Sequence, residues 1–169
     1  MTIDWLFNDG NVGAQGTGGA LVATESTTVL ITALNGTDQV ITGNGGVDVL
    51  SGGFGNDTLT GYVGYDILTG GPGSDRFDYN SVFDGTDTIT DFTLGAGGDV
   101  LDMHDVLGSF TGISLTHDNA FTGGFLQFIA SGTDTMVQVD SDGGGDSYIS
   151  LAVLINTLPL PISTDNYLL

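Results

Sequence analysis

The chain has almost no positive charge, because its 169 residues include one arginine, Arg76, and no lysine. Nucleic acids, anionic lipids and polyanionic sugars are bound largely through Lys and Arg, so we exclude all three as partners on electrostatic grounds. Cysteine is also absent, which excludes disulfides, thiolate metal sites and cysteine nucleophiles. These absences leave oxygen ligands as the main chemistry of any metal site.

Long apolar runs and an N-terminal signal peptide are missing as well. The most apolar stretch, residues 149–162, is interrupted by two prolines and is too short and too broken to cross a bilayer. The first residues have no basic segment followed by an apolar run, so they do not resemble a signal for general export. We therefore expect a soluble chain without membrane insertion, and a monomer.

What the chain has in excess is aspartate. Of its 21 acidic residues only Glu25 is a glutamate, and the formal net charge is -20. Aspartate is a residue of turns and of sites for hard cations. A mean hydropathy of +0.21, together with nine Phe and five Tyr residues, argues against disorder. We therefore expect a folded chain whose acids are neutralised by something bound.

A nine-residue period organises the middle of the sequence. Four copies follow one another without a gap, at residues 43–51, 52–60, 61–69 and 70–78, each with Gly at positions one and four and Asp at position six. A fifth copy, residues 35–42, precedes them with Gly36 and Asp38 in step and one extra residue before Gly43. The acids of the five copies are Asp38, Asp48, Asp57, Asp66 and Asp75.

The period predicts a turn of six residues followed by a strand of three. Only the middle strand residue points inward, because strand side chains alternate, so position eight should form the core. Two repeats make one coil, with a strand on each side, and repeats n and n+2 stack. The predicted inward residues are Leu50, Leu59, Leu68 and Phe77.

The same stacking should bring aspartates together. Stacked strands are ~4.8 Å apart, so we expect Asp38 over Asp57, Asp57 over Asp75, and Asp48 over Asp66. Two carboxylates at that separation repel by roughly 3 to 4 kcal/mol at an effective dielectric near 20. Ca²⁺ takes six to eight oxygens, and an ion between two coils reaches both, whereas Mg²⁺ needs shorter bonds and retained water. Such a repeat is typical of a Ca²⁺-binding β-solenoid, and the stacked pairs predict about three or more ions.

These residues resemble the RTX family, the nonapeptide-repeat proteins that bacteria export by type I secretion. The resemblance implies that Ca²⁺ is bound by the Asp at position six and by the carbonyls of positions one to four. Tyr62 and Pro72 depart from the pattern, and Tyr62 would be strained if position two needs a positive φ. The carbonyls implied as ligands, with two from the leading copy, belong to Gly43, Asn44, Gly45, Gly46, Gly52, Gly53, Phe54, Gly55, Gly61, Tyr62, Val63, Gly64, Gly70, Gly71, Pro72, Gly73, Asn35 and Gly36.

The flanks suggest a domain order. We expect an all-β fold, a right-handed parallel β-roll at residues 34–78, with a β lead-in at 1–33 and a β cap at 79–169. Residues 83–107 and 136–151 are similar to the C-terminal blocks of secreted adhesins and serralysin-type proteins, with one short helix or turn expected at 101–107. In such proteins the last residues carry an uncleaved export signal, to which 165–169 are similar. The resemblance implies the type I secretion machinery and a parent polypeptide N-terminal to this chain as partners.

Two further acidic segments have alternative interpretations. Asp84 follows Asp66 at a spacing of two repeats, so it either closes another Ca²⁺ site or forms an ordinary Asp-Gly turn. Residues 140–146 begin like an EF-hand loop, but position twelve is Leu151 instead of Glu. A looser Ca²⁺ loop or a glycine-rich hairpin remains, and the hairpin is favoured.

No catalytic motif is present, and the two histidines have no zinc-site spacing. We expect no enzyme activity and no cofactor other than Ca²⁺. The predicted function is a calcium-dependent folding and secretion module of a large bacterial adhesin, unfolded in the cytosol and folded outside or at the cell surface. The alternatives are the accessory module of an exported hydrolase, and a solenoid that binds sugar or ice.

Overall fold

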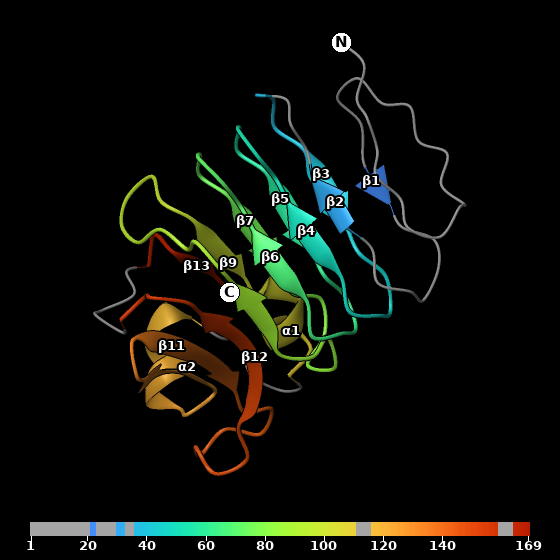
Figure 1. The fold of residues 1–169 in the computed structure, drawn as a ribbon. Coiled ribbons are helices and arrows are strands. Elements are labelled where there is room, and N and C mark those ends of the chain that lie inside the picture. Colours follow the sequence, from blue (N-terminus) through green and yellow to red (C-terminus); the bar gives the residue numbers. More distant parts are fainter. Residues whose placement is uncertain (1–20, 23–29, 33–35, 111–115, 159–163) are drawn as a thin grey trace.

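The computed structural model describes residues 21–22, 30–32, 36–110, 116–158 and 164–169. Most of the predicted lead-in at 1–33 and the predicted ligand Asn35 lie outside this part of the chain. Where it is described, the structure is a two-sheet parallel β-solenoid with two short helices (Figure 1). The predicted β-roll is therefore confirmed.

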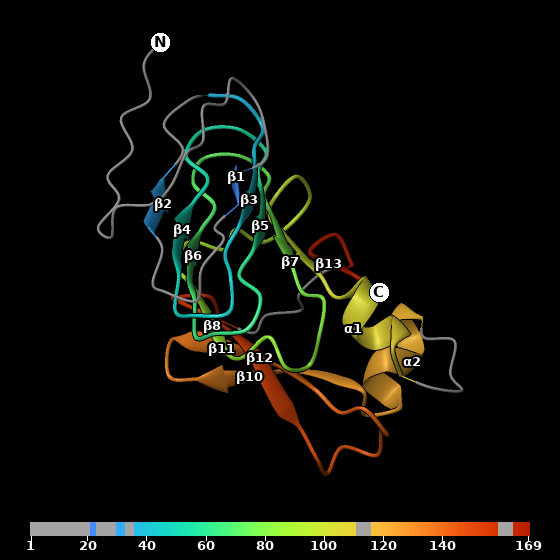
Figure 2. The ribbon, with the colours of Figure 1, turned by 90° about the vertical axis from the view of Figure 1, so that its right-hand side faces the viewer.

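Short strands alternate between two facing sheets as the chain coils. The first sheet contains, in order, β1 (Leu21–Val22), β3 (Val40–Thr42), β5 (Thr58–Thr60), β7 (Arg76–Asp78), β9 (Val100–Asp102) and β13 (Tyr167–Leu168). The second contains β2 (Leu30–Thr32), β4 (Val49–Ser51), β6 (Ile67–Thr69) and β8 (Asp87–Ile89). All of these pairings are parallel, which is the stacking of repeat n on repeat n+2 expected from the period (Figure 2).

The core lies between the two sheets and consists of the middle residue of each strand. Leu50, Leu59 and Phe77 are fully buried, and Leu68 is 1% exposed. In β4, β6 and β7 the residues on either side of this middle position point away from the core and are more exposed, whereas in β5 Thr60 is also buried. The predicted core positions are therefore confirmed, and Ile41, Ile89 and Leu101 extend the ladder at both ends.

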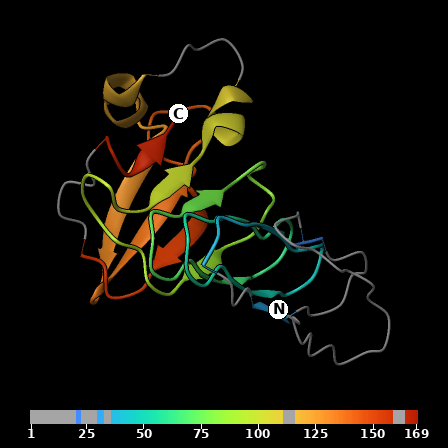
Figure 3. The same cartoon turned by 90° about the horizontal axis from the view of Figure 1, so that it is seen from above.

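A compact C-terminal part closes one end of the roll. The strands β10 (Leu126–Ser131), β11 (Asp134–Val139) and β12 (Ile149–Leu154) form an antiparallel meander, and β12 continues the second sheet by pairing in parallel with β8. In Figures 1 and 3 this meander and the helices gather at the end of the roll opposite to β1 and β2. A solenoid needs such a cap because its last coil would otherwise expose the core.

Two short helices accompany the cap. Helix α1 (His104–Gly108) overlaps the short helix or turn expected at 101–107. Helix α2 (His117–Thr122) was not predicted, and its start is explained by a capping box between Thr116 and Asn119. Among the described residues, no helix is both long and apolar enough to cross a membrane.

Candidate metal sites

Buried aspartates line both edges of the roll where the turns stack. In five of them one carboxylate oxygen, Oδ1, accepts an N–H from the coil before it: Asp57, Asp66, Asp75, Asp87 and Asp99. Asp66 accepts from the Asp48 N–H at 2.8 Å, and Asp75 accepts from the Asp57 N–H at 2.8 Å. These four side chains are at most 1% exposed. The predicted columns of position-six aspartates therefore exist in the structure.

The first position of one column differs from the prediction. Register pairs Ile41 with Leu59, so Gln39 and not Asp38 lies over Asp57, and the Gln39 N–H donates to Asp57 Oδ1 at 2.7 Å. Asp38 is exposed, and its carboxylate accepts the Asn56 N–H at 2.8 Å. The stacking of Asp38 on Asp57 was therefore wrong by one residue, because the extra residue of the first copy lies between Asp38 and the strand and puts Gln39 at position six.

The coils that follow the repeats are longer than two nonapeptides. Asp66 donates its N–H to Asp87 Oδ1 at 3.0 Å, and Asp75 donates its N–H to Asp99 Oδ1 at 2.9 Å. The partner that continues the column beyond Asp66 is thus Asp87, and Asp84 is not the stacked residue that its spacing of two repeats suggested. Asp87 and Asp99 were missed because nothing in the period signals a longer coil.

The second carboxylate oxygen, Oδ2, of the stacked aspartates tests whether these residues could bind a cation. Oδ2 of Asp57, Asp66 and Asp75 is buried and has no hydrogen-bond partner among the described residues. A buried acceptor without a partner is costly, and for a carboxylate it is more costly than for a neutral group. Three such oxygens at equivalent positions of successive turns indicate ligand positions, because a bound cation would satisfy all of them.

The glycine at position one lets other oxygens approach these carboxylates. A Cβ placed on Gly52 would overlap Asp57 Oδ2 and lie 2.6 Å from the carbonyl oxygen of Gly70, one coil further on. A Cβ on Gly43 would likewise overlap Asp48 Oδ2 and lie 2.7 Å from the Gly61 carbonyl oxygen. Carboxylate and carbonyl oxygens from two coils thus converge at these turns, which is the donor set that Ca²⁺ takes.

The electrostatics of the columns also favour a cation. Burial raises the pKa of Asp66 and of Asp75 to about 6 and that of Asp87 to about 8, and neighbouring carboxylates contribute to each rise. Hydrogen bonds from the backbone offset only part of this rise in pKa. Without a cation, the fold therefore disfavours the ionised carboxylates that it holds together.

Backbone strain marks one of the turns. Tyr62 has φ = 64° at position two, where Gly53 and Gly71 also have positive φ. The left-handed conformation costs a non-glycine residue of order 1 kcal/mol or more. The strain predicted for Tyr62 is therefore present. The ligand roles of the individual turn carbonyls remain predictions.

The acidic segment at 140–146 forms the loop between β11 and β12, as the favoured hairpin interpretation expected. Carboxylate oxygens of Asp140, Asp142 and Asp146 lie within 4.8 Å of one another. Buried Asp140 accepts N–H groups of Gly145 and Asp146 at 3.2 and 3.1 Å, so it already holds the loop in shape. The structure thus gives this aspartate a structural role that requires no ion.

Comparison with known proteins agrees with this geometry. Residues 42–77 match the family model of the RTX calcium-binding nonapeptide repeat, with four copies. Twenty-eight chains of solved structures match. One is the solution structure of the AlgE6R3 subunit from the Azotobacter vinelandii mannuronan C5-epimerase, with a TM-score of 0.62 and 26% identity over 92% of this chain and 86% of that chain. A search of curated proteins found no match.

Proposed function

We propose, from the premise that this chain carries RTX calcium-binding nonapeptide repeats in a β-roll, that it is a calcium-dependent folding module of an exported bacterial protein. The observation that carries the proposal is that Oδ2 of Asp57 and Asp75 in one column, and of Asp66 in the other, is buried without a hydrogen-bond partner among the described residues. Without Ca²⁺ these carboxylates oppose folding, and with Ca²⁺ they hold the coils together. The module therefore remains unfolded where Ca²⁺ is scarce and folds where it is abundant.

The physical basis is linkage between binding and folding. An ion that binds only the folded chain stabilises it by RT ln(1 + [Ca²⁺]/Kd) per site, about 2.7 kcal/mol when the concentration is 100 times Kd. The contributions of several sites along one solenoid add, because solenoid stability is approximately a sum over repeats and the interfaces between them. A change from cytosolic to external Ca²⁺ can therefore decide whether the roll forms.

Circular dichroism during a Ca²⁺ titration tests the proposal. We expect little regular structure in chelator and a β spectrum at micromolar to millimolar Ca²⁺. Mg²⁺ at the same concentrations is the matched control, and it should be much less effective because it retains water and needs strict octahedral geometry. A β spectrum that is the same with chelator and with Ca²⁺ would contradict the proposed function.

We place the module in an adhesin that is exported unfolded by a type I secretion machinery and folds outside the cell or at its surface. The RTX match supports export, and the similarity of residues 83–107 and 136–151 to C-terminal blocks of secreted proteins supports this placement. In this proposal a parent polypeptide precedes the chain, and the sequence of that polypeptide would distinguish the candidates. Repeated adhesive domains are expected for an adhesin, whereas a catalytic motif there would identify an accessory module of an enzyme.

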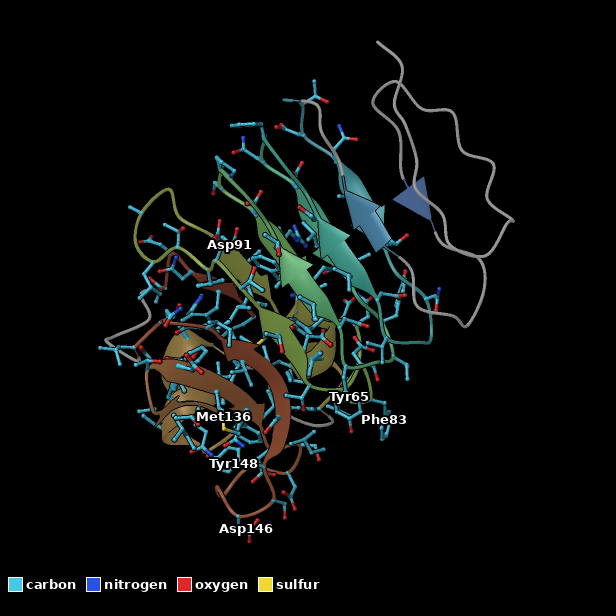
Figure 4. All side chains as sticks on the ribbon, viewed as in Figure 1. Tyr65, Phe83, Asp91, Met136, Asp146 and Tyr148 are labelled. Atoms are coloured by element: carbon cyan, nitrogen blue, oxygen red, sulfur yellow. The ribbon has the colours of Figure 1, made fainter. Side chains whose placement is uncertain are left out.

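The second candidate is an accessory module of an exported polysaccharide-modifying enzyme. It is favoured by the similarity to a subunit of a mannuronan C5-epimerase. One edge of the roll also exposes aromatic rings, since Tyr65 is 71% and Phe83 is 77% exposed (Figure 4). Affinity electrophoresis in gels containing a neutral polysaccharide, with Ca²⁺ present, tests this candidate, because the net charge of -20 argues against a polyanionic sugar. Unretarded migration in such gels would remove it.

A further inference from the structure

The C-terminal segment, residues 164–169, returns to the roll and completes its first sheet. Its strand β13 pairs in parallel with β9 (Figure 1). The Leu101 N–H donates to the Asn166 carbonyl at 2.9 Å, and the Met103 N–H donates to the Leu168 carbonyl at 3.1 Å. This junction lies well outside the matched RTX repeats.

The side chain of Asn166 is buried in the turn that precedes β9, residues 93–99. Its Nδ2 is within hydrogen-bond distance of three carbonyl oxygens of this turn, those of Thr93 at 3.4 Å, Gly95 at 3.3 Å and Asp99 at 2.8 Å. Its Oδ1 accepts the Gly95 N–H at 2.8 Å. The residue is 0% exposed, so one amide group contacts the turn through both of its polar atoms.

The backbone of the turn is shaped around the amide nitrogen. The Asp99 N–H donates to the Thr93 carbonyl at 2.8 Å, and the Gly98 N–H donates to the Gly95 carbonyl at 2.9 Å. Both carbonyl oxygens have a second lone pair, and this is the one available to Asn166. Because carbonyl oxygens carry partial negative charge, three of them converge at low cost only around a hydrogen-bond donor or a cation.

The aspartate of this turn differs from those of the repeats in having both carboxylate oxygens hydrogen-bonded. Asp99 Oδ1 accepts the Asp75 N–H at 2.9 Å, and Asp99 Oδ2 accepts the Thr93 N–H at 2.7 Å. In the same column, Oδ2 of Asp57 and of Asp75 is buried without a partner among the described residues. The turn at 93–99 is thus satisfied by groups of the chain itself.

A second carboxamide lies at the opposite end of this column. Gln39 occupies position six there and is 5% exposed. Its Nε2 donates to the Thr37 carbonyl at 2.9 Å, to the Thr37 hydroxyl at 2.6 Å and to the Asp38 carbonyl at 3.2 Å. An amide nitrogen therefore binds several turn oxygens at each end of the column, and the aspartates with an unpartnered Oδ2 lie between the two ends.

We propose that these two carboxamides terminate the aspartate column, and that the turn at 93–99 is a binding site whose ligand is the Asn166 side chain. An amide nitrogen donates two hydrogens without a net charge, so it satisfies converging carbonyls where an acidic turn needs a cation. The C-terminal segment is thus a built-in ligand that closes the last coil. Its coupling to Ca²⁺ runs through the bond from Asp75 to Asp99, and only this coupling rests on the proposed function.

Hydrogen exchange of the Ca²⁺-loaded full chain tests the binding site. Asn166→Ala removes both polar atoms of the amide, so the Leu101 N–H should exchange faster by about tenfold or more. The N–H groups of Thr58 and Ile67, bonded within the roll, should keep their wild-type rates. Leu168→Ala is the control, because it changes an exposed side chain of the same strand and should alter none of these rates. A wild-type rate for the Leu101 N–H in Asn166→Ala overturns the binding site.

Ion counting distinguishes an amide ligand from a filler of space. Equilibrium dialysis with ⁴⁵Ca²⁺ should give the wild-type number of ions for Asn166→Ala, because the amide replaces an ion at this turn. Asn166→Asp keeps the shape but turns an oxygen toward three carbonyl oxygens. The new carboxylate either leaves the turn, with fast exchange at the Leu101 N–H, or stays with one ion more than the wild type, and both results support the amide ligand. Wild-type exchange with the wild-type ion number overturns it, as does an ion lost in Asn166→Ala.

The same measurements apply at the other end of the column. Gln39→Glu turns an oxygen toward the oxygens of Thr37 and Asp38, and the Thr58 N–H, which donates to the Gln39 carbonyl at 2.8 Å, reports on this turn. We expect faster exchange there or one more bound ion, and neither change would overturn the role of Gln39. A wild-type chain that binds no Ca²⁺ overturns the proposed function instead, while the exchange test at Asn166 still applies, so the two failures are distinguishable.

Discussion

At the scale of single residues, the close approach of successive turns makes some glycines irreplaceable and leaves others free. A Cβ on Gly73 would overlap the carbonyl oxygen of Gly55 in the coil before it, whereas a Cβ on Gly45 meets no atom within 4 Å. Backbone cannot move aside without separating the coils. We therefore expect Gly73→Ala to lower the free energy of unfolding at saturating Ca²⁺ by about 2 kcal/mol or more.

Gly45→Ala is the matched control for this prediction. Both glycines lie in turns of the repeats and neither has a positive φ, so backbone strain does not distinguish them. The control should change stability by no more than about 0.5 kcal/mol. Urea unfolding of both variants in the same Ca²⁺ buffer measures the difference. If the two variants unfold at the same urea concentration, the close stacking of these turns is wrong.

At the scale of the turns and strands, the corrected register changes which aspartates matter most. Asp75 lies between Asp57 and Asp99, and Asp66 lies between Asp48 and Asp87, so each of these two faces a carboxylate on both sides. Asp57 has Gln39 on one side. We expect Asp75→Asn to shift the logarithm of the Ca²⁺ midpoint about twice as far as Asp57→Asn, because it weakens two coil interfaces.

The second column provides an independent comparison. Asp66→Asn should shift the Ca²⁺ midpoint further than Asp48→Asn, as followed by circular dichroism. Asn keeps an oxygen that can accept the same backbone N–H, so the change reports mainly the lost charge. If Asp75→Asn shifts the Ca²⁺ midpoint no further than Asp57→Asn, and Asp66→Asn no further than Asp48→Asn, each carboxylate contributes to one coil interface only.

The repeats were predictable from the sequence because one period determines turn, strand and core together. Leu50 and Leu59 follow from that period alone, whereas the strain at Tyr62 was expected only on the condition that position two needs a positive φ. At the first copy the prediction failed because its extra residue was not placed between Asp38 and the strand, where it puts Gln39 at position six. Beyond the last repeat it failed because nothing in the period shows that the next column member after Asp66 is Asp87. Those positions depend on how loops of unequal length close against the roll, which only the packed structure determines.

At the scale of the whole molecule, buried negative charge has almost no protein counterpart. Nine aspartates are buried in the described residues, while the only basic residue besides the histidines, Arg76, is paired with Asp102. Carboxylates that are buried without an opposite charge must bind protons or cations. Protons and Ca²⁺ are therefore competitors for the same oxygens, and pH should act on the two forms of the protein in opposite directions.

The ion-free chain should gain structure as the pH falls. The folded-state pKa of Asp66 and Asp75 is about 6 and that of Asp87 about 8, against 3.8 ordinarily, so the folded state binds more protons between these values. Their contribution to stability is complete below about pH 3.8 and is lost as the pH rises through 6 and 8. In chelator, the β signal should therefore increase as the pH is lowered from 8 to 5. The Ca²⁺ midpoint should move to higher concentration over the same range, because the ligands must be deprotonated.

Asp87→Asn should flatten the plot of β signal against pH in chelator between pH 8 and 6, since the amide does not titrate. A β signal in chelator that decreases as the pH is lowered to 5 would mean that the buried carboxylates do not control folding.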